Sequence, residues 1–302
     1  MSQLHPFAGV LPAACTQFTE NEAVDHDATL AHLDAMIDAG VHGMVMLGTV
    51  GENYALTGDE KIELLRKTVA HLKGRVPVIT GVAETTTKSA VDFTKAAADV
   101  GVDGFMVMPA LVYVSDVREN VHHFKSVAAA SDRPVMIYNN PVSYRVDLRP
   151  DDFKHLADID NVVAIKESSN DPRRITDLFN AHGDRFSLLC GVDDLVMESF
   201  ILGATGWISG LVNAFPAENR LLWDLMKANR WDEAREVYRW YTPLLHLDTL
   251  PKLVQYIKLA SQECGYGNER CRAPRLDIEG EERERVLGMI RHAKANRPEI
   301  QV

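Results

Sequence analysis

The sequence is poor in cysteine, with four in 302 residues and no Cys-x-x-Cys pair. Scattered thiols at Cys15, Cys190, Cys264 and Cys271 are typical of a reducing compartment and argue against a disulfide frame or a zinc site. No run of about 18 apolar residues occurs. The first seven residues also lack the charged and apolar segments of a secretory signal. We therefore expect a cytoplasmic protein without a membrane span.

Basic residues are also scarce, since 32 Lys and Arg stand against 43 Asp and Glu and give a formal net charge of −11. A nucleic acid or an anionic membrane binds to a basic surface, so this balance argues against both as partners. It does not argue against a small anionic substrate, which senses only its local pocket. The chain is 46% hydrophobic and 25% charged, which is ordinary for a globular protein.

Glycine is missing where a nucleotide-binding fold needs it, and metal-ligand clusters are missing too. The first strand is followed by residues 16–20, Thr-Gln-Phe-Thr-Glu, without the glycines of a dinucleotide-binding turn. His122 and His123 are adjacent on a predicted helix and point about 100° apart, so one ion cannot bind both from one face. The sequence therefore predicts neither a cofactor nor a metal.

What the sequence does contain is an alternation of apolar and amphipathic segments. Apolar segments predict strands at 9–16, 43–48, 77–80, 104–108, 134–138, 162–165, 186–190 and 205–209. Helical patterns follow at 25–40, 57–73, 86–100, 116–130, 149–157, 172–180, 193–202 and 218–228. Eight such units with almost continuously apolar strands favour a closed (β/α)8 TIM barrel over an open doubly wound sheet.

Three more helical patterns, at 232–247, 252–264 and 281–295, follow without further strands. We expect a catalytic barrel over residues 1–230 and a C-terminal helical domain over residues 231–302. In such barrels the chemistry occurs where the strands end, at their C-terminal face.

Lys166 ends the apolar run Val162–Ile165, and it is the only cation expected at the tip of a barrel strand. An amine kept from water there is a nucleophile that forms a Schiff base with a carbonyl. Alternatively, the lysine extends to solvent or pairs with Glu167. Tyr138 ends the adjacent strand, and its phenol is suited to moving protons beside such a lysine. Its alternative role is packing, with the hydroxyl bound to a backbone carbonyl.

The turn after the second strand, Gly48-Thr49-Val50-Gly51, offers successive backbone N–H groups that suit a carboxylate. The alternative interpretation is a simple tight turn. Many barrels bind phosphate in the loops after strands seven and eight. Here Asp193 and Asp194 occupy the first of those loops and would repel it, so we expect a non-phosphorylated substrate.

These segments together make the chain resemble the dihydrodipicolinate synthase/N-acetylneuraminate lyase family from about residue 7 to residue 298. The resemblance is carried by Gly48-Thr-Val-Gly-Glu52, Tyr138-Asn-x-Pro141, Ala164-Ile-Lys-Glu167 and Gly191-Val-Asp-Asp194. It implies a Schiff-base lysine acting on a 2-oxo acid, without a separate cofactor, in a homotetramer built as a dimer of dimers.

The resemblance also implies individual roles. Lys166 would be the Schiff-base lysine and Tyr138 the proton-relay phenol. Thr49 would hydrogen bond to that tyrosine, and the Thr49–Val50 amides in the Gly48 loop would hold the substrate carboxylate. Gly191 and Ile208 would line the pocket near the lysine.

Three departures from the family pattern concern the substrate. Val50 stands where the synthases have a second threonine, and Ser143 stands where they have an arginine for the second substrate's carboxylate. Leu111 replaces a tyrosine that reaches into the neighbouring subunit's site. Tyr113 and Arg145 lie close enough in sequence to substitute, which the sequence leaves open. The sialic-acid lyases differ as well, with a serine at the position of Thr49.

The resemblance therefore favours family members that act on one substrate. The candidates are keto-deoxy sugar acid dehydratases or aldolases, and the deaminase of 1-pyrroline-4-hydroxy-2-carboxylate. The apolar Val50 and Leu111 suit a compact 2-oxo or cyclic 2-imino acid. A true dihydrodipicolinate synthase, which condenses pyruvate with aspartate semialdehyde, is the alternative enzyme. A non-catalytic binding barrel is the alternative from a different class.

Overall fold

Eight parallel strands form the centre of the protein in the computed structural model, which describes residues 5–300. Each strand pairs with the next one in the chain from β2 to β8, and β8 pairs with β1. A bridge from Ala13 to Val45 joins β1 to β2 and closes the sheet into a barrel. The strands are β1 (Gly9–Pro12), β2 (Met44–Met46), β3 (Val78–Val82), β4 (Gly104–Val107), β5 (Val135–Asn139), β6 (Val162–Glu167), β7 (Ser187–Cys190) and β8 (Gly206–Ser209). The predicted TIM barrel is confirmed.

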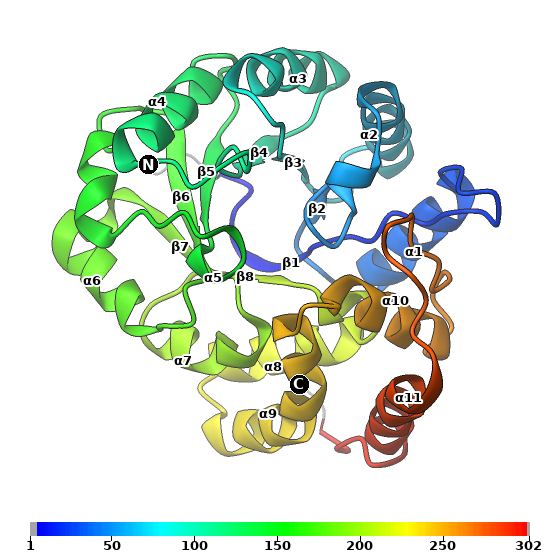
Figure 1. The fold of residues 1–302 in the computed structure, drawn as a ribbon. Coiled ribbons are helices and arrows are strands. Elements are labelled where there is room, and N and C mark those ends of the chain that lie inside the picture. The colour runs from blue at the N-terminus through cyan, green and yellow to red at the C-terminus, as the bar shows by residue number, and fades with distance from the viewer. Residues whose placement is uncertain (1–4, 301–302) are drawn as a thin grey trace.

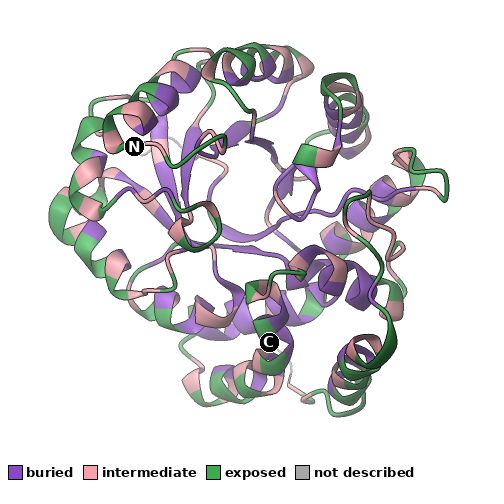
Figure 2. Ribbon diagram, in the orientation of Figure 1, coloured by how far each residue is buried: buried purple, intermediate pink, exposed green. Residues whose placement is uncertain are grey.

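A ring of helices surrounds this barrel (Figure 1). The helices of the ring are α1 (His26–Asp38), α2 (Gly58–Leu72), α3 (Thr87–Val100), α4 (Val117–Ala128), α6 (Arg173–His182), α7 (Val196–Ile201) and α8 (Pro216–Lys227). The residues of the strands and of the inner faces of these helices are buried, while the outer faces are exposed (Figure 2). Strands that are buried on both sides explain why the apolar segments show no polar alternation.

Local sequence determines where several helices begin. Thr57 accepts a hydrogen bond from the Glu60 N–H, and the Glu60 carboxylate accepts one from the Thr57 N–H, so α2 starts with a capping box. Asp116 and Glu119 do the same for α4. These reciprocal bonds satisfy N–H groups that have no partner within the helix.

The structure corrects two predicted elements and adds a third that was not predicted. The helix predicted at 149–157 is a 3₁₀ segment, η2 (Pro150–His155). The helix predicted at 193–202 is divided into η4 (Asp193–Leu195) and α7. A short helix that we did not predict, α5 (Pro141–Tyr144), follows β5 over the barrel opening (Figure 1) and ends at Arg145, which has a positive φ of 59°.

The C-terminal extension comprises α9 (Trp231–Leu245), η6 (His246–Thr249), α10 (Leu253–Glu263) and α11 (Gly280–Ala295). A fully buried ion pair connects it to the loop after β2, because Lys258 Nζ lies 2.6 Å from Glu52 Oε1. The domain boundary at residue 230 stays a prediction. Among residues 5–300, no helix is long and apolar enough to span a membrane.

Candidate active site

Lys166 and Tyr138 face each other across neighbouring strands. The register of β5 and β6 makes them Cα partners, as the strand ends predicted. The Lys166 ammonium nitrogen lies 3.9 Å from the centroid of the Tyr138 ring, and only 6% of the lysine is exposed. The amine is thus held at the mouth of the barrel and does not extend into bulk water.

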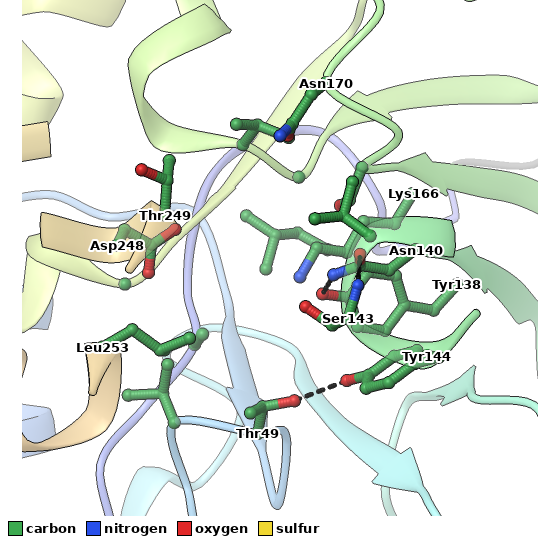
Figure 3. Close-up of a pocket in the computed structure, with 18 of the residues that line it drawn as sticks. Thr49, Tyr138, Asn140, Ser143, Tyr144, Lys166, Asn170, Asp248, Thr249 and Leu253 are labelled. Carbon is green, nitrogen blue, oxygen red and sulfur yellow. Dashed lines mark hydrogen bonds between the residues drawn. The ribbon is translucent and has the colours of Figure 1, made fainter. Parts of the chain in front are cut away.

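The two residues open into a cavity of about 440 Å³ at the C-terminal ends of the strands (Figure 3). Five other residues predicted for the site line the same cavity: Thr49, Val50, Ser143, Gly191 and Ile208. A Cβ atom at position 191 would lie 2.6 Å from Cε of Lys166. Glycine is therefore needed there for the lysine side chain to reach the cavity.

Glu167 is not the partner of Lys166. Successive residues of a strand point to opposite faces, and the Glu167 carboxylate accepts hydrogen bonds from Asn139 Nδ2 at 3.1 Å and from the Ser169 N–H at 2.7 Å. Burial raises the pKa of this carboxyl group, which the hydrogen bonds oppose. No ion pair of Lys166 with a carboxylate occurs within residues 5–300.

The hydrogen bond predicted between Thr49 and Tyr138 is wrong. Thr49 Oγ1 lies 2.6 Å from the hydroxyl of Tyr144, and these two groups share a hydrogen bond (Figure 3). The Tyr138 hydroxyl instead accepts a hydrogen bond from Asn140 Nδ2 at 3.0 Å. The reason is α5, which folds back over the barrel and inserts a second phenol beside the first.

Tyr144 is close to Tyr138 as well as to Thr49. The two tyrosine rings meet edge to face with centroids 5.5 Å apart. Burial raises the pKa of the Tyr144 phenol well above its usual value, and the neighbouring phenol of Tyr138 raises it further. The hydrogen bond from Thr49 has the opposite effect. The Tyr144 phenol consequently keeps its proton at neutral pH.

The loop after β2 presents backbone N–H groups to the cavity. Within residues 5–300, the N–H groups of Thr49 and Val50 donate to no carbonyl or side chain. The loop is anchored from behind by Glu52, whose carboxylate binds Lys258 and the Arg272 N–H. Two adjacent unpaired N–H groups in a fixed turn suit a carboxylate.

Two residues predicted for the pocket do not line it, namely Leu111 and Gly48. After β4 the chain leaves the barrel mouth, so Leu111 lies on a segment that ends in the exposed residues Val112, Tyr113 and Val114. Gly48 faces Met106, and only the following residues of its loop reach the cavity. Neither Tyr113 nor Arg145 lines the cavity in place of the missing family residues.

Asp193 is a structural residue, because its buried carboxylate accepts hydrogen bonds from Trp207 Nε1, from the Ser209 hydroxyl and from two backbone N–H groups. Burial raises its pKa to about 6. Asp194 binds His246 Nδ1 at 2.6 Å.

Within residues 5–300, no group of three or more His, Cys, Asp or Glu side chains is arranged to hold a metal ion.

A profile of the dihydrodipicolinate synthetase family matches residues 6–293. The chain belongs to this family. The protein is a Schiff-base (class I) lyase of this family.

Named relatives in the family are mostly synthases. The chain is 30% identical over 295 residues to a 4-hydroxy-tetrahydrodipicolinate synthase of Staphylococcus haemolyticus, covering 96% of this chain and 98% of that protein. It is 36% identical over 208 residues to an uncharacterised DapA-like lyase of Halobacterium salinarum, covering 69% and 68%.

Solved structures of the family superpose closely. The dihydrodipicolinate synthase of Aquifex aeolicus has a TM-score of 0.91 at 29% identity, over 95% of this chain and 98% of that one. YagE of E. coli, solved in complex with pyruvate, has a TM-score of 0.90 at 26% identity, over 95% and 99%.

Tyr144 and Asp248 are among the cavity residues that sequence reasoning missed. A signal for Tyr144 was present, because Asn140 followed by Pro141 is an N-cap with proline at the first helical position. That pattern would have predicted a helix that begins at Pro141, but not its position over the barrel. Asp248 lies on the C-terminal extension, and no local pattern connects it with a strand end.

Proposed function

We propose that this lyase acts on a small, non-phosphorylated 2-oxo or cyclic 2-imino acid that carries one carboxylate. The observation that supports this most is the charge of the cavity. Within residues 5–300, Lys166 and Asp248 are the only Lys, Arg, Asp or Glu residues that line it. With the amine committed to the Schiff base, no cation is left to bind a second carboxylate or a phosphate.

In this proposal the Thr49 and Val50 N–H groups bind the substrate carboxylate, which brings C2 to the amine of Lys166. The neutral amine attacks C2, and the C2–O bond of the resulting carbinolamine breaks. The departing oxygen takes a proton from the Tyr138 phenol and leaves as water. For a cyclic imine the same attack opens the ring, and the ring nitrogen leaves C2.

The iminium then makes the C3 protons acidic. Loss of one C3 proton yields the enamine, whose electrons then expel a group from C4. In an aldolase the C3–C4 bond breaks instead, its electrons move to the iminium, and the products are the enamine and an aldehyde. The compact cavity, which has no second Lys or Arg among the described residues that line it, favours a short deoxy-keto acid or 1-pyrroline-4-hydroxy-2-carboxylate as substrate.

Ser143 is the main argument against the condensing synthases. It lines the cavity, and its N–H donates to Asn140 Oδ1 at 2.9 Å as part of α5. A serine at this place cannot form the charge-assisted hydrogen bond of an arginine to the second substrate, a loss of about 1.5–3 kcal/mol of binding.

The test is a comparison of three reactions by the purified protein. The reactions are turnover of 1-pyrroline-4-hydroxy-2-carboxylate, turnover of 2-keto-3-deoxygluconate, and condensation of pyruvate with aspartate semialdehyde. We expect kcat/KM for one of the first two to exceed that of the condensation by about 10²-fold, the discrimination that one missing charged contact provides. The Ser143→Arg variant is the matched control and should raise the condensation alone. A wild-type protein that condenses most efficiently would show this proposal to be wrong.

We also propose that the protein is a cytoplasmic homotetramer, as the family resemblance implies. Three consecutive apolar residues, Val112, Tyr113 and Val114, are 58–63% exposed at the edge of the barrel mouth. Such a patch commonly belongs to an interface. The four cysteines carry free thiols, which fits a reducing compartment. Sedimentation should give four times the chain mass, and a monomer at micromolar concentration would contradict the proposal.

A further inference from the structure

Asp248 is an ionisable cavity residue that has no part in the Schiff-base steps described above. It lies on η6 of the C-terminal extension and lines the same cavity as Lys166. Figure 3 shows Asp248 across the cavity from Tyr138, with the Lys166 amine between them. Thr49, which marks the carboxylate end of the site, lies on another side of the amine.

The position of Asp248 is fixed by its surroundings. Its neighbour His246 binds Asp194 Oδ2 at 2.6 Å, which holds η6 against η4. A Cβ atom at Gly210 would lie 2.3 Å from Asp248 Oδ1, so the glycine after β8 leaves the space that this carboxyl group occupies. The side chain is thus placed at the barrel mouth by contacts from two loops.

The charges around Asp248 favour its protonated form. Burial raises the pKa of its carboxyl group well above the usual value, and the negative charge of Asp193 adds to this. Asp194 acts in the same direction, whereas the positive charge of Lys166 opposes it. His246, the remaining titratable group on η6, points toward Asp194. Once Lys166 is bound to the substrate, a protonated Asp248 is a hydrogen-bond donor beside the substrate chain.

We propose that Asp248 is the catalytic acid at C4 and that the substrates are acids with a hydroxyl group on C4, either as the 2-oxo acid or as its cyclic imine. This inference rests on the proposed Schiff-base function. With C1 bound by the loop after β2 and C2 bound to Lys166, the chain beyond C3 extends away from Thr49 into the part of the cavity that Asp248 lines.

The proposed step is an elimination from the enamine. The nitrogen lone pair re-forms the C2=N bond, the C2=C3 electrons move to form C3=C4, and the C4–O bond breaks with its electron pair on oxygen. That oxygen takes the proton of Asp248 and leaves as water. The Asp248 carboxylate then regains a proton from solvent. A substrate with a second carboxylate near C4 would be repelled by Asp248 while that residue is ionised.

The experiment uses two probes on the full-length protein. Exchange of the C3 protons of pyruvate in D₂O, followed by NMR, requires Lys166 and the phenols but no leaving group. Dehydration of 4-hydroxy-2-oxobutanoate to 2-oxobut-3-enoate requires the acid as well. For Asp248→Asn we expect pyruvate exchange at the wild-type rate and dehydration slowed by about 10²-fold or more, as for loss of a general acid.

Asp232→Asn is the matched control, because it makes the same change at a carboxylate of the C-terminal extension that is 96% exposed and lies outside the cavity. Its dehydration rate should equal that of the wild type. The wild-type dehydration rate should fall as pH rises through the pKa of Asp248, and Asp248→Asn should lack this dependence.

Dehydration by Asp248→Asn at the wild-type rate would overturn the proposal, as would cleavage of the probe to pyruvate and formaldehyde by the wild type. Loss of both readouts in Asp248→Asn would also overturn it, because the residue would then act on Schiff-base formation. Absence of pyruvate exchange in the wild type would instead refute the underlying Schiff-base function.

Discussion

Replacing Tyr144 with phenylalanine tests whether the second phenol belongs to the proton relay. The change removes one hydroxyl and breaks the 2.6 Å hydrogen bond to Thr49, while the ring contact with Tyr138 is kept. Loss of one buried hydrogen bond costs about 0.5–1.5 kcal/mol of stability, so the variant should remain folded. A group positioned for proton transfer contributes about 10²–10⁴-fold. In this hypothesis Tyr144 acts on the substrate only through Tyr138, whose ring it contacts, so we expect the lower end of that range.

The assay is the exchange of pyruvate C3 protons in D₂O, compared with Schiff-base formation in the same samples. For Tyr144→Phe we expect exchange to slow by about 10²-fold, while Lys166 still forms the adduct. Tyr256→Phe is the control, because it also removes one hydrogen-bonded phenol, which donates to Glu282 outside the cavity. If Tyr144→Phe exchanges protons as fast as Tyr256→Phe, the argument from the Thr49–Tyr144 hydrogen bond is refuted.

Three further changes test the structure around the site. Gly191→Ala would place Cβ 2.6 Å from Cε of Lys166 and so displace the lysine side chain. A displacement of the amine by about 1 Å should slow adduct formation with pyruvate by about 10²-fold. An unchanged rate would contradict the close approach of Gly191 to Lys166. Lys258→Met removes the buried ammonium group from the Glu52 carboxylate, which keeps only the Arg272 N–H and the more distant Arg275. Urea unfolding should show a loss at the lower end of about 3–5 kcal/mol, and a neutral result would mean that the pair does not hold the extension to the barrel. A hydrogen bond from the guanidinium of Arg272 lowers the pKa of Glu60 from 4.5 to about 2. The stability that this bond contributes is complete above pH 4.5 and is lost as pH falls toward 2. Unfolding free energies of wild type and Glu60→Gln should therefore converge over that interval, and a constant difference would contradict the assignment.

The barrel and the reactive pair could be predicted from the sequence because both depend on local patterns. Eight apolar segments without polar alternation indicate buried parallel strands, and the ends of such strands share one face. Lys166 and Tyr138 end neighbouring strands, so their pairing followed from the strand ends alone. Gly191 was expected near the lysine for the same reason.

The remainder of the site depends on how loops fold back, which strand ends do not determine. Tyr144 reaches Thr49 only because α5 turns over the barrel mouth. Leu111 failed as a pocket residue because the segment after β4 turns outward. Asp248 comes from a helical extension far along the chain, and its place depends on contacts with Asp194 and on the space left by Gly210.

The central claim is that the amine of Lys166 bonds covalently to C2 of a 2-oxo acid. The most direct test is borohydride reduction of the protein mixed with pyruvate, followed by mass spectrometry of its peptides. The account predicts one stable adduct, on the peptide that contains Lys166, and no adduct on that peptide in Lys166→Ala. An unmodified Lys166 peptide in the wild type, together with full activity of Lys166→Ala on a substrate of the enzyme, would contradict it.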